Sequence, residues 1–344
     1  MTTEPSVSET EMSPAVTDTL DFSVVICAYT ERRWEALIEA VESLERQTVP
    51  PREVIVVIDH NEALLQRALE RFRDLSVPVA VIENHQERGL SGARNSGVAA
   101  ASAAIIAFLD DDAAADERWL EFTRDAFLDE RVMGVGATID LDWQGPAPQW
   151  FPAEFNWTVG GTYRGMPTSR APVRNLIGAA MAIRGSLLKG SEGFRSVLGR
   201  TDAVKLPLGG EETELCIRLK QRHPANHFVY EPRANVKHKV TLDRATWRYF
   251  TRRCYAEGLS KAHMSRLVGK QDGLSSERAY VLQALPSGVL RGVRDTVFKR
   301  DLHGLGRSAA IVLGLLATAT GFLVGSKAPK NTTTTTTTAA TTVP

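Results

Sequence analysis

The chain has 344 residues, of which 43% are hydrophobic, and its 41 Lys and Arg balance 41 Asp and Glu. These proportions exclude a disordered chain, a collagen-like fibre and a multi-pass membrane protein. Because the net charge is zero, nothing attracts the whole chain to nucleic acid, and we expect no nucleic-acid partner. The three cysteines are far apart and odd in number, which argues against a disulfide framework and is typical of a reducing compartment.

The two ends of the chain differ in composition from the region between them. Residues 1–20 are polar and acidic and lack the basic start and apolar core of a signal peptide. We therefore expect a disordered tail there, on a protein that is not secreted. Residues 327–344 are rich in threonine and are also expected to be disordered, because such a segment cannot build a core.

Between these ends, short β-branched apolar runs alternate with segments of helical periodicity. The predicted strands are residues 22–28, 54–58, 77–82, 105–109 and 132–140. The predicted helices are residues 34–47, 62–74, 90–101 and 119–128. This order predicts an α/β fold with a mostly parallel sheet and helices on both faces.

Polar residues follow the first, second and fourth predicted strands, and the carboxyl ends of parallel strands meet at one edge. The most informative group is Asp110-Asp111-Asp112, because three adjacent carboxylates repel one another unless a cation lies among them. Oxygen ligands of this kind suit Mg2+ or Mn2+, which complete their shells with phosphate oxygens and water. Taken alone, the triplet is equally compatible with a solvated acidic turn.

A glycine-rich segment, GLSGARNSG at residues 89–97, precedes this triplet. It combines backbone N–H groups with the guanidinium of Arg94, which suits contact with a phosphate. A glycine-rich helix start is the alternative for this segment. The segment matches neither the dinucleotide-binding fingerprint nor the P-loop, and both of those sites are therefore disfavoured.

Together these segments resemble the inverting GT-A glycosyltransferases of family 2, over about residues 22–264. SVVICAYTERR resembles the opening strand and nucleotide-binding turn of that family, and VIVVIDHN stands at its Asp-Asp-Gly-Ser-like segment. The run that begins at residue 89 and ends in FLDDDA resembles the segment of that family that leads into its Asp-x-Asp motif. GGEETELCIRL stands at an acidic pair that opens a helix, and VKHKV supplies a later histidine. The shared order and spacing of these five segments carry the resemblance.

The resemblance implies a role for individual residues. The residues that it implies for nucleotide binding are Ala28, Tyr29, Glu31, Asp59, Arg94, Asp110 and Asp111. The implied ligands of a Mn2+ or Mg2+ cofactor, which would bridge the donor diphosphate, are Asp110, Asp112 and His238. The sequence departs from the family pattern at His60, where a second aspartate is usual.

The resemblance also implies the catalytic group and the acceptor side. The expected general base is Glu212, and Glu211 is the neighbour most easily confused with it; the family usually has Glu-Asp here. For these two, the alternative is a favourable interaction with the helix N-terminus. The residues expected to line the acceptor or donor-sugar pocket are Trp150, Trp157, Arg174, Asn175 and Gly178.

The implied activity is metal-dependent transfer of a sugar, with inversion, from a nucleotide-diphosphate sugar to an acceptor hydroxyl. A UDP-sugar is the favoured donor. Residues 150–175 resemble a bacterial and archaeal branch that acts on polyprenyl- or dolichyl-phosphate-linked sugars, including hexuronic acid transferases. We therefore expect a lipid-linked sugar or another glycan as acceptor. The alternatives are a retaining glycosyltransferase, a nucleotidyltransferase and a non-catalytic nucleotide-sugar-binding protein.

An uncharged segment near the C-terminus, residues 308–326, is long enough to cross a bilayer as a helix, although a buried core helix is the alternative. We expect it to anchor the protein, either by spanning the membrane or by lying at its surface. More basic residues precede it than follow it, which predicts a catalytic domain at the cytoplasmic face of the cell membrane. The expected order is a GT-A domain at 21–265, divided into a nucleotide-binding half (21–140) and an acceptor-binding half (141–265), a helical linker at 266–307 and the membrane helix at 308–326.

Overall fold

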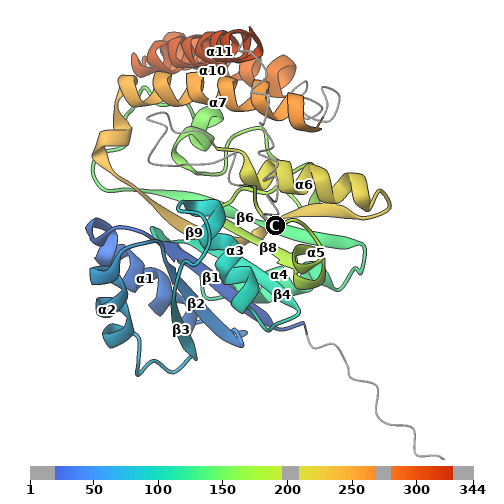
Figure 1. Cartoon of the computed structure of the whole chain (residues 1–344). Helices are drawn as coiled ribbons and strands as arrows, with labels where there is room; N and C mark the ends of the chain where they lie inside the picture. The colour runs from blue at the N-terminus through green and yellow to red at the C-terminus, as the bar shows by residue number, and fades with distance from the viewer. Residues whose placement is uncertain (1–19, 196–208, 269–279, 328–344) are drawn as a thin grey trace, which may run out of the picture.

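The computed structural model describes residues 20–195, 209–268 and 280–327. Within these ranges the chain forms a nine-stranded sheet in the order β3-β2-β1-β4-β8-β6-β9-β5, with β7 paired to β9 (Figure 1). The two expected tails fall almost entirely on residues 1–19 and 328–344, which lie outside the described residues.

The first half of the sheet is parallel, as the sequence predicts. Its strands are β1 (Phe22–Ala28), β2 (Glu53–Ile58), β3 (Val79–Glu83) and β4 (Ile105–Asp110). The helices that connect them are α1 (Trp34–Glu45), α2 (Glu62–Arg71) and α3 (Leu90–Ala100). The sheet grows from β1 to one side through β2 and β3, and then continues on the other side of β1 with β4. The carboxyl ends of β1 and β4 therefore flank a topological switch point.

The second half of the sheet mixes strand directions, so the predicted parallel arrangement does not extend through it. Its strands are β5 (Ala113–Ala115), β6 (Val132–Trp143), β7 (Ala171–Val173), β8 (Ala180–Arg184) and β9 (His227–Val240). β8 runs antiparallel to both β4 and β6, whereas β6 and β9 are parallel. Antiparallel strands need no helical crossover, and the chain reaches β8 through irregular segments without the earlier rhythm.

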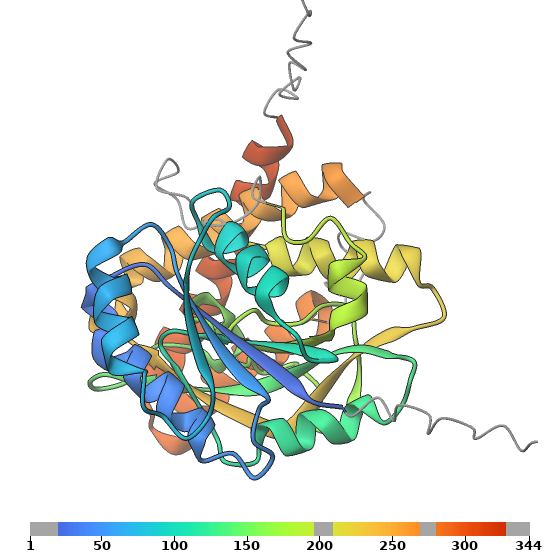
Figure 2. The same cartoon turned by 60° about the horizontal axis from the view of Figure 1, so that its bottom comes forward.

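Helices cover both faces of the sheet, because the buried side chains of each strand alternate between the faces. Val24 and Ile26 lie in the core beneath α1, α2 and α4 (Trp119–Phe127). Val25 lies in the opposite core, to which α3, α5 (Gly185–Lys189) and α6 (Glu211–Arg222) contribute. Figure 2 shows the helices on the two sides of the twisted sheet.

A third layer consists of α7 (Trp247–Val268), α10 (Leu285–Lys299) and α11 (His303–Lys327), with the π-helical turn Tyr280–Ala284. These helices stack at the end of the molecule beyond α6 (Figure 1). Their buried residues form a core with Phe155 of the 3-10 segment Ala153–Val159. The expected linker and membrane helix both belong to this layer, although residues 269–279 lie outside the described part of the chain.

Candidate active site

The polar residues that follow β1 and β4 lie side by side. Cys27 is the register partner of Asp110, so the two chains leave the sheet next to each other at the switch point. This is the place where open α/β sheets bind ligands. The pocket there, named the strand-end pocket, is lined by Cys27, Ala28, Tyr29, Arg33, Asp59, Arg88, Gly89, Leu90, Ala93, Asp110 and Asp111.

Asp110, Asp112 and His238 form a compact group, with one ligand atom of each lying within 4.8 Å of the others. The histidine comes from a distant part of the sequence, and strand pairing brings it here. β5 pairs with β9 so that Ala113 is the register partner of His238, and Lys239 N–H donates to the Asp112 carbonyl at 2.8 Å. The sheet itself thus positions the histidine beside the aspartates.

This group fits a divalent cation. Two carboxylates and an imidazole converge, and His238 Nε2 lies 3.1 Å from Asp112 Oδ1. His238 Nδ1 is buried without a hydrogen-bond partner among the described residues. Gly160, with a φ of 89°, lies against the ring, and a Cβ there would come within 3.0 Å of His238 Cε1. The donor set is one that binds a hard or borderline cation.

Two arginines surround the same aspartates. Arg33 Nη1 lies 2.6 Å from Asp111 Oδ1 and 3.1 Å from Asp112 Oδ2, and Arg244 Nη2 lies 4.0 Å from Asp112 Oδ2. Burial raises the pKa of Asp111 to about 7, although Arg33 opposes the shift. Burial also acts to raise the pKa of Asp112, but the hydrogen bond and charge of His238, together with both arginines, hold that pKa well below its usual range.

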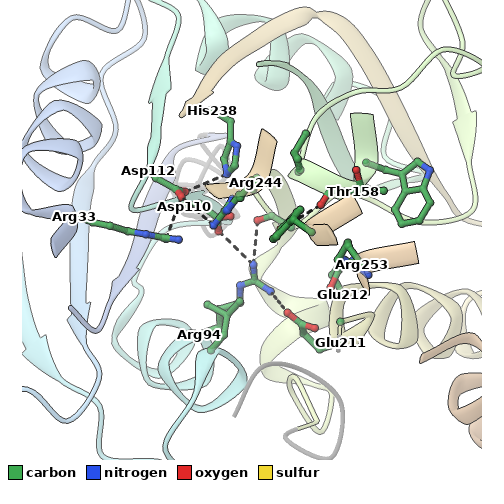
Figure 3. A pocket seen from close by; sticks show the side chains of 18 residues that line it. Arg33, Arg94, Asp110, Asp112, Thr158, Glu211, Glu212, His238, Arg244 and Arg253 are labelled. Carbon is green, nitrogen blue, oxygen red and sulfur yellow. Dashed lines mark hydrogen bonds and ion pairs between the residues drawn. The ribbon is translucent and has the colours of Figure 1, made fainter. Parts of the chain in front are cut away.

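Arg94 connects this group to the start of α6. Its side chain is 3% exposed; Nη1 lies 3.0 Å from Glu211 Oε1, and Nη2 lies 3.6 Å from Asp110 Oδ1. Nη2 also donates to the Gly178 carbonyl at 3.1 Å. A Cβ on Gly178 would lie 2.7 Å from Nη2, so a larger residue there would displace the guanidinium. Figure 3 shows Arg94 between these partners.

The two glutamates that begin α6 have different surroundings. Gly210, with a φ of 109°, precedes the helix, and Glu211 then turns toward Arg94 while Glu212 lies on the side of Arg253 (Figure 3). Glu212 has no ion pair among the residues that the structure describes, whereas Glu211 is paired with Arg94. Burial raises the pKa of Glu212 to about 8, and the charge of Glu211 acts in the same direction.

Three adjoining pockets run through the molecule. The pocket that contains Arg94, Asp112, Glu211 and His238 is named the central cleft. It shares Arg33, Leu90 and Asp110 with the strand-end pocket. A rear pocket opens on the other side of the cleft, between the loop after β7 and the third helical layer. The central cleft and the rear pocket have three lining residues in common, namely Trp157, Glu212 and Arg253. Glu212 therefore stands at the boundary between two spaces.

The structure brings most of the predicted site residues into these pockets. Ala28, Tyr29, Asp59, Asp110 and Asp111 line the strand-end pocket. The central cleft contains Arg94, Asp110, Asp112, Trp157, Gly178, Glu211, Glu212 and His238. The rear pocket contains Trp157, Arg174, Asn175 and Glu212.

Two predicted residues lie elsewhere. Glu31 is exposed in the short 3-10 helix Glu31–Arg33, and the ring of Trp150 stacks on Trp247 at 4.0 Å between centroids. Neither residue lines any of the three pockets. Conversely, sequence reasoning did not single out Arg33 or Arg244. The only signal for Arg33 was its position in the turn after the first strand.

Comparison with known proteins indicates the family and the fold. Residues 23–190 match the model of Glycosyl transferase family 2. Over 308 residues the chain is 28% identical to the glucosyl-dolichyl phosphate glucuronosyltransferase of Haloferax volcanii, a match that covers 89% of this chain and 96% of the relative. It is 40% identical over 94 residues to the uncharacterized glycosyltransferase YwdF of Bacillus subtilis, which covers 27% of this chain and only 33% of that relative.

A solved structure shows the same fold. The mannosyltransferase PcManGT from Pyrobaculum calidifontis, in complex with GDP-Man and Mn2+, superposes with a TM-score of 0.52 at 15% identity over 86% of each chain. The predictions of a GT-A fold and of a glycosyltransferase are confirmed. The chain is therefore a glycosyltransferase whose residues 23–190 form a family 2 domain.

Proposed function

We propose that the protein transfers a sugar, with inversion, from a nucleotide-diphosphate sugar to a sugar carried on a lipid phosphate. The observation that carries this proposal is the position of Glu212, which lines both the central cleft and the rear pocket. In a single displacement, a base must reach the acceptor hydroxyl while that hydroxyl faces the donor. A carboxylate at the boundary of two pockets meets this requirement.

The donor occupies the strand-end pocket and the central cleft. Asp110, Asp112 and His238 would hold Mn2+ or Mg2+, and such a cation offsets negative charge on a leaving diphosphate. Arg33 and Arg244 lie at the same aspartates, so their guanidinium groups add positive charge toward the diphosphate oxygens. A UDP-sugar remains the favoured donor, and the Haloferax relative, a glucuronosyltransferase by name, supports a hexuronic acid as the sugar.

The acceptor occupies the rear pocket. Its lining combines the cations Arg174, Arg253 and Lys261 with apolar side chains such as Leu285 and Leu315. This mixture suits a phosphate that carries a hydrocarbon chain, because the guanidinium and ammonium groups bind the phosphate while the apolar wall contacts the chain. The Haloferax volcanii relative is named as a transferase that acts on glucosyl-dolichyl phosphate, and this name supports the same acceptor class.

In the proposed reaction, the acceptor hydroxyl attacks the anomeric carbon of the donor from the rear pocket. Glu212 takes the proton as the new C–O bond forms, and the electron pair of the breaking bond leaves with the diphosphate. The raised pKa of Glu212, about 8, makes its ionised form a stronger base than an ordinary glutamate carboxylate, and the share of that form increases as the pH rises toward 8. Glu211 is held by Arg94, and we assign it a positioning role.

We also propose that the catalytic domain works at the cytoplasmic face of the cell membrane. Six basic residues and two acidic ones lie in residues 280–327, and the cytoplasmic leaflet attracts basic segments through its anionic lipids.

The reaction itself is tested with a panel of nucleotide sugars and a lipid-phosphate-linked sugar. Release of a nucleoside diphosphate and a product of inverted anomeric configuration by NMR are expected. Release of pyrophosphate would indicate a nucleotidyltransferase, retained configuration would indicate a retaining enzyme, and absence of turnover with every donor would indicate a binding protein.

A further inference from the structure

The outer face of α11 is apolar, which is the reverse of a helix at the surface of a soluble protein. Between its first residue, His303, and its last, Lys327, the large exposed side chains recur at helical spacing and are apolar: Leu305, Val312, Leu313, Leu316, Leu323 and Val324. Their exposed fractions range from 46% at Leu313 to 61% at Leu323.

α10, which packs against α11, also exposes apolar side chains. Leu290, Val293 and Val297 recur at helical spacing with exposed fractions of 70%, 41% and 64%, and Phe298 and Leu302, each 79% exposed, lead toward α11. α10 and α11 pack against each other on the outside of the molecule (Figure 1). Exposed apolar side chains in this number on two neighbouring helices are typical of an interaction site.

The inner face of α11 is fixed to α7 along much of its length. A Cβ on Gly258 of α7 would overlap the carbonyl of Thr318, and a Cβ on Gly321 would overlap the carbonyl of Tyr255. Further along, a Cβ on Gly325 would lie 2.8 Å from Ala262. The two helices thus run beside each other with their backbones in close approach.

This packing decides between a spanning and a surface-bound helix. α7 carries several charged residues, and Arg253 and Glu257 line the rear pocket. If α11 crossed a bilayer in this arrangement, the adjoining α7 would enter the hydrocarbon, where each charged residue costs about 2.5–3.5 kcal/mol on insertion scales. If α11 instead separated from α7 in order to cross the bilayer, the close contacts at Gly258, Gly321 and Gly325 would be lost.

Charge identifies what covers the apolar face. Only Asp295 and Asp301 are acidic in residues 280–327, and they pair with Lys299 and Arg307. The exposed cations that remain include Arg294 and Arg300. Exposed cations together with exposed Leu, Val and Phe side chains on the same two helices are the composition of a surface that inserts among anionic lipid headgroups.

We infer that α10 and α11 form a docking surface that lies in the plane of an anionic bilayer, with α11 held on the catalytic domain rather than spanning the membrane. Leu315 and Thr318 of α11 also line the rear pocket, so docking would place that pocket at the lipid surface. The inference concerns binding to lipid alone, and it holds or fails independently of the proposed reaction.

Vesicle flotation of the whole chain tests the lipid partner. Leu313→Asp/Leu316→Asp and Val293→Asp/Val297→Asp should each lower binding to phosphatidylglycerol-containing vesicles by about tenfold or more, because apolar contacts are lost and acidic charge is added. Leu128→Asp, at a leucine beside α4 that is more exposed (71%) than any of these four residues, is the control and should bind like wild type. Wild-type binding should weaken on pure phosphatidylcholine. Equal binding by all variants would overturn the inference.

A second copy of the chain is the competing occupant of this surface. Without lipid, sedimentation should show the same oligomeric state for the wild type and for the Asp variants. A wild-type dimer that the Asp substitutions dissociate, together with vesicle binding by those variants equal to wild type, would assign the surface to self-association and overturn the inference.

Cysteine labelling tests the in-plane orientation. His303→Cys and Ser326→Cys place a thiol near each end of α11, and the wild-type chain with its three native cysteines provides the background. On sealed vesicles, an impermeant maleimide added outside should label both ends. If one end reacts only after detergent is added, α11 spans the bilayer and the inference is wrong.

Discussion

Arg94 Nη1 lies 3.0 Å from Glu211 Oε1, so the first carboxylate of α6 is already neutralised by a buried cation. Glu212, one residue later, has no such partner among the described residues and has a raised pKa. Two adjacent carboxylates therefore differ in their chemistry, because Glu211 has a buried cationic partner whereas burial raises the pKa of Glu212. This difference is the basis for assigning the base to Glu212 and a positioning role to Glu211.

Loss of Arg94 should destabilise the protein strongly. Arg94→Met leaves Glu211 buried without its cation, and breaking a buried pair in this way costs about 3–5 kcal/mol. Adding Glu211→Gln to Arg94→Met should restore part of that loss, because the unpaired charge is removed. Denaturant unfolding measures both effects. Arg118→Met, which removes an exposed pair with Glu121, is the control and should change the midpoint little. Additive losses from the two substitutions would contradict the coupling.

The metal group should control donor binding. Asp112→Ala should abolish the Mn2+-dependent part of nucleoside diphosphate binding, and His238→Ala should weaken it less, because water and phosphate can fill the vacated position. Calorimetry with and without Mn2+ measures the difference. Asp129→Asn is the control, since this aspartate pairs with Arg131 and lines none of the three pockets. Unchanged affinity for Asp112→Ala would remove that residue from the metal site.

The position of His238 should depend on Gly160. Gly160→Ala introduces a Cβ 3.0 Å from the His238 ring and a side chain at a φ of 89°, so it should shift the ring and weaken Mn2+ binding. Gly209→Ala is the control, because a Cβ there would meet Arg253 only at an ordinary 3.7 Å. Mn2+ titration followed by electron paramagnetic resonance should give a weaker affinity for the first variant alone. Equal affinities would show that the ring position does not limit binding.

The sequence predicted the first half of the fold because the signals there are local. Each strand from β1 to β3 is an apolar run rich in β-branched residues and is followed by a helix, and the three aspartates begin at the last residue of β4. His238 came only from the family resemblance, since its place depends on pairing between β5 and β9. Trp150 was expected in a pocket and lies in an aromatic core, because sequence does not distinguish aromatic packing from aromatic recognition.

Desolvation of the Glu212 carboxylate should reduce the stability of the protein as the pH rises. Its pKa rises from 4.5 to about 8 on folding, so folding favours the protonated carboxyl. The stabilisation is complete below about 4.5 and is lost as the pH rises through about 8. Glu212→Gln is neutral at every pH, and its melting temperature should therefore exceed that of wild type increasingly between pH 5 and pH 9. A constant difference across that range would contradict a raised pKa.

The most direct test of the account compares Glu212→Gln with Glu211→Gln in steady-state turnover. Glu212→Gln keeps the shape of the side chain but cannot accept a proton, so kcat should fall by a factor of about 10² to 10⁴ while nucleoside diphosphate affinity stays near wild type. Glu211→Gln should retain much more turnover and act mainly through the position of Arg94. If Glu211→Gln is inactive and Glu212→Gln is active, the base is the other glutamate; if both remain active, the proposed mechanism is wrong.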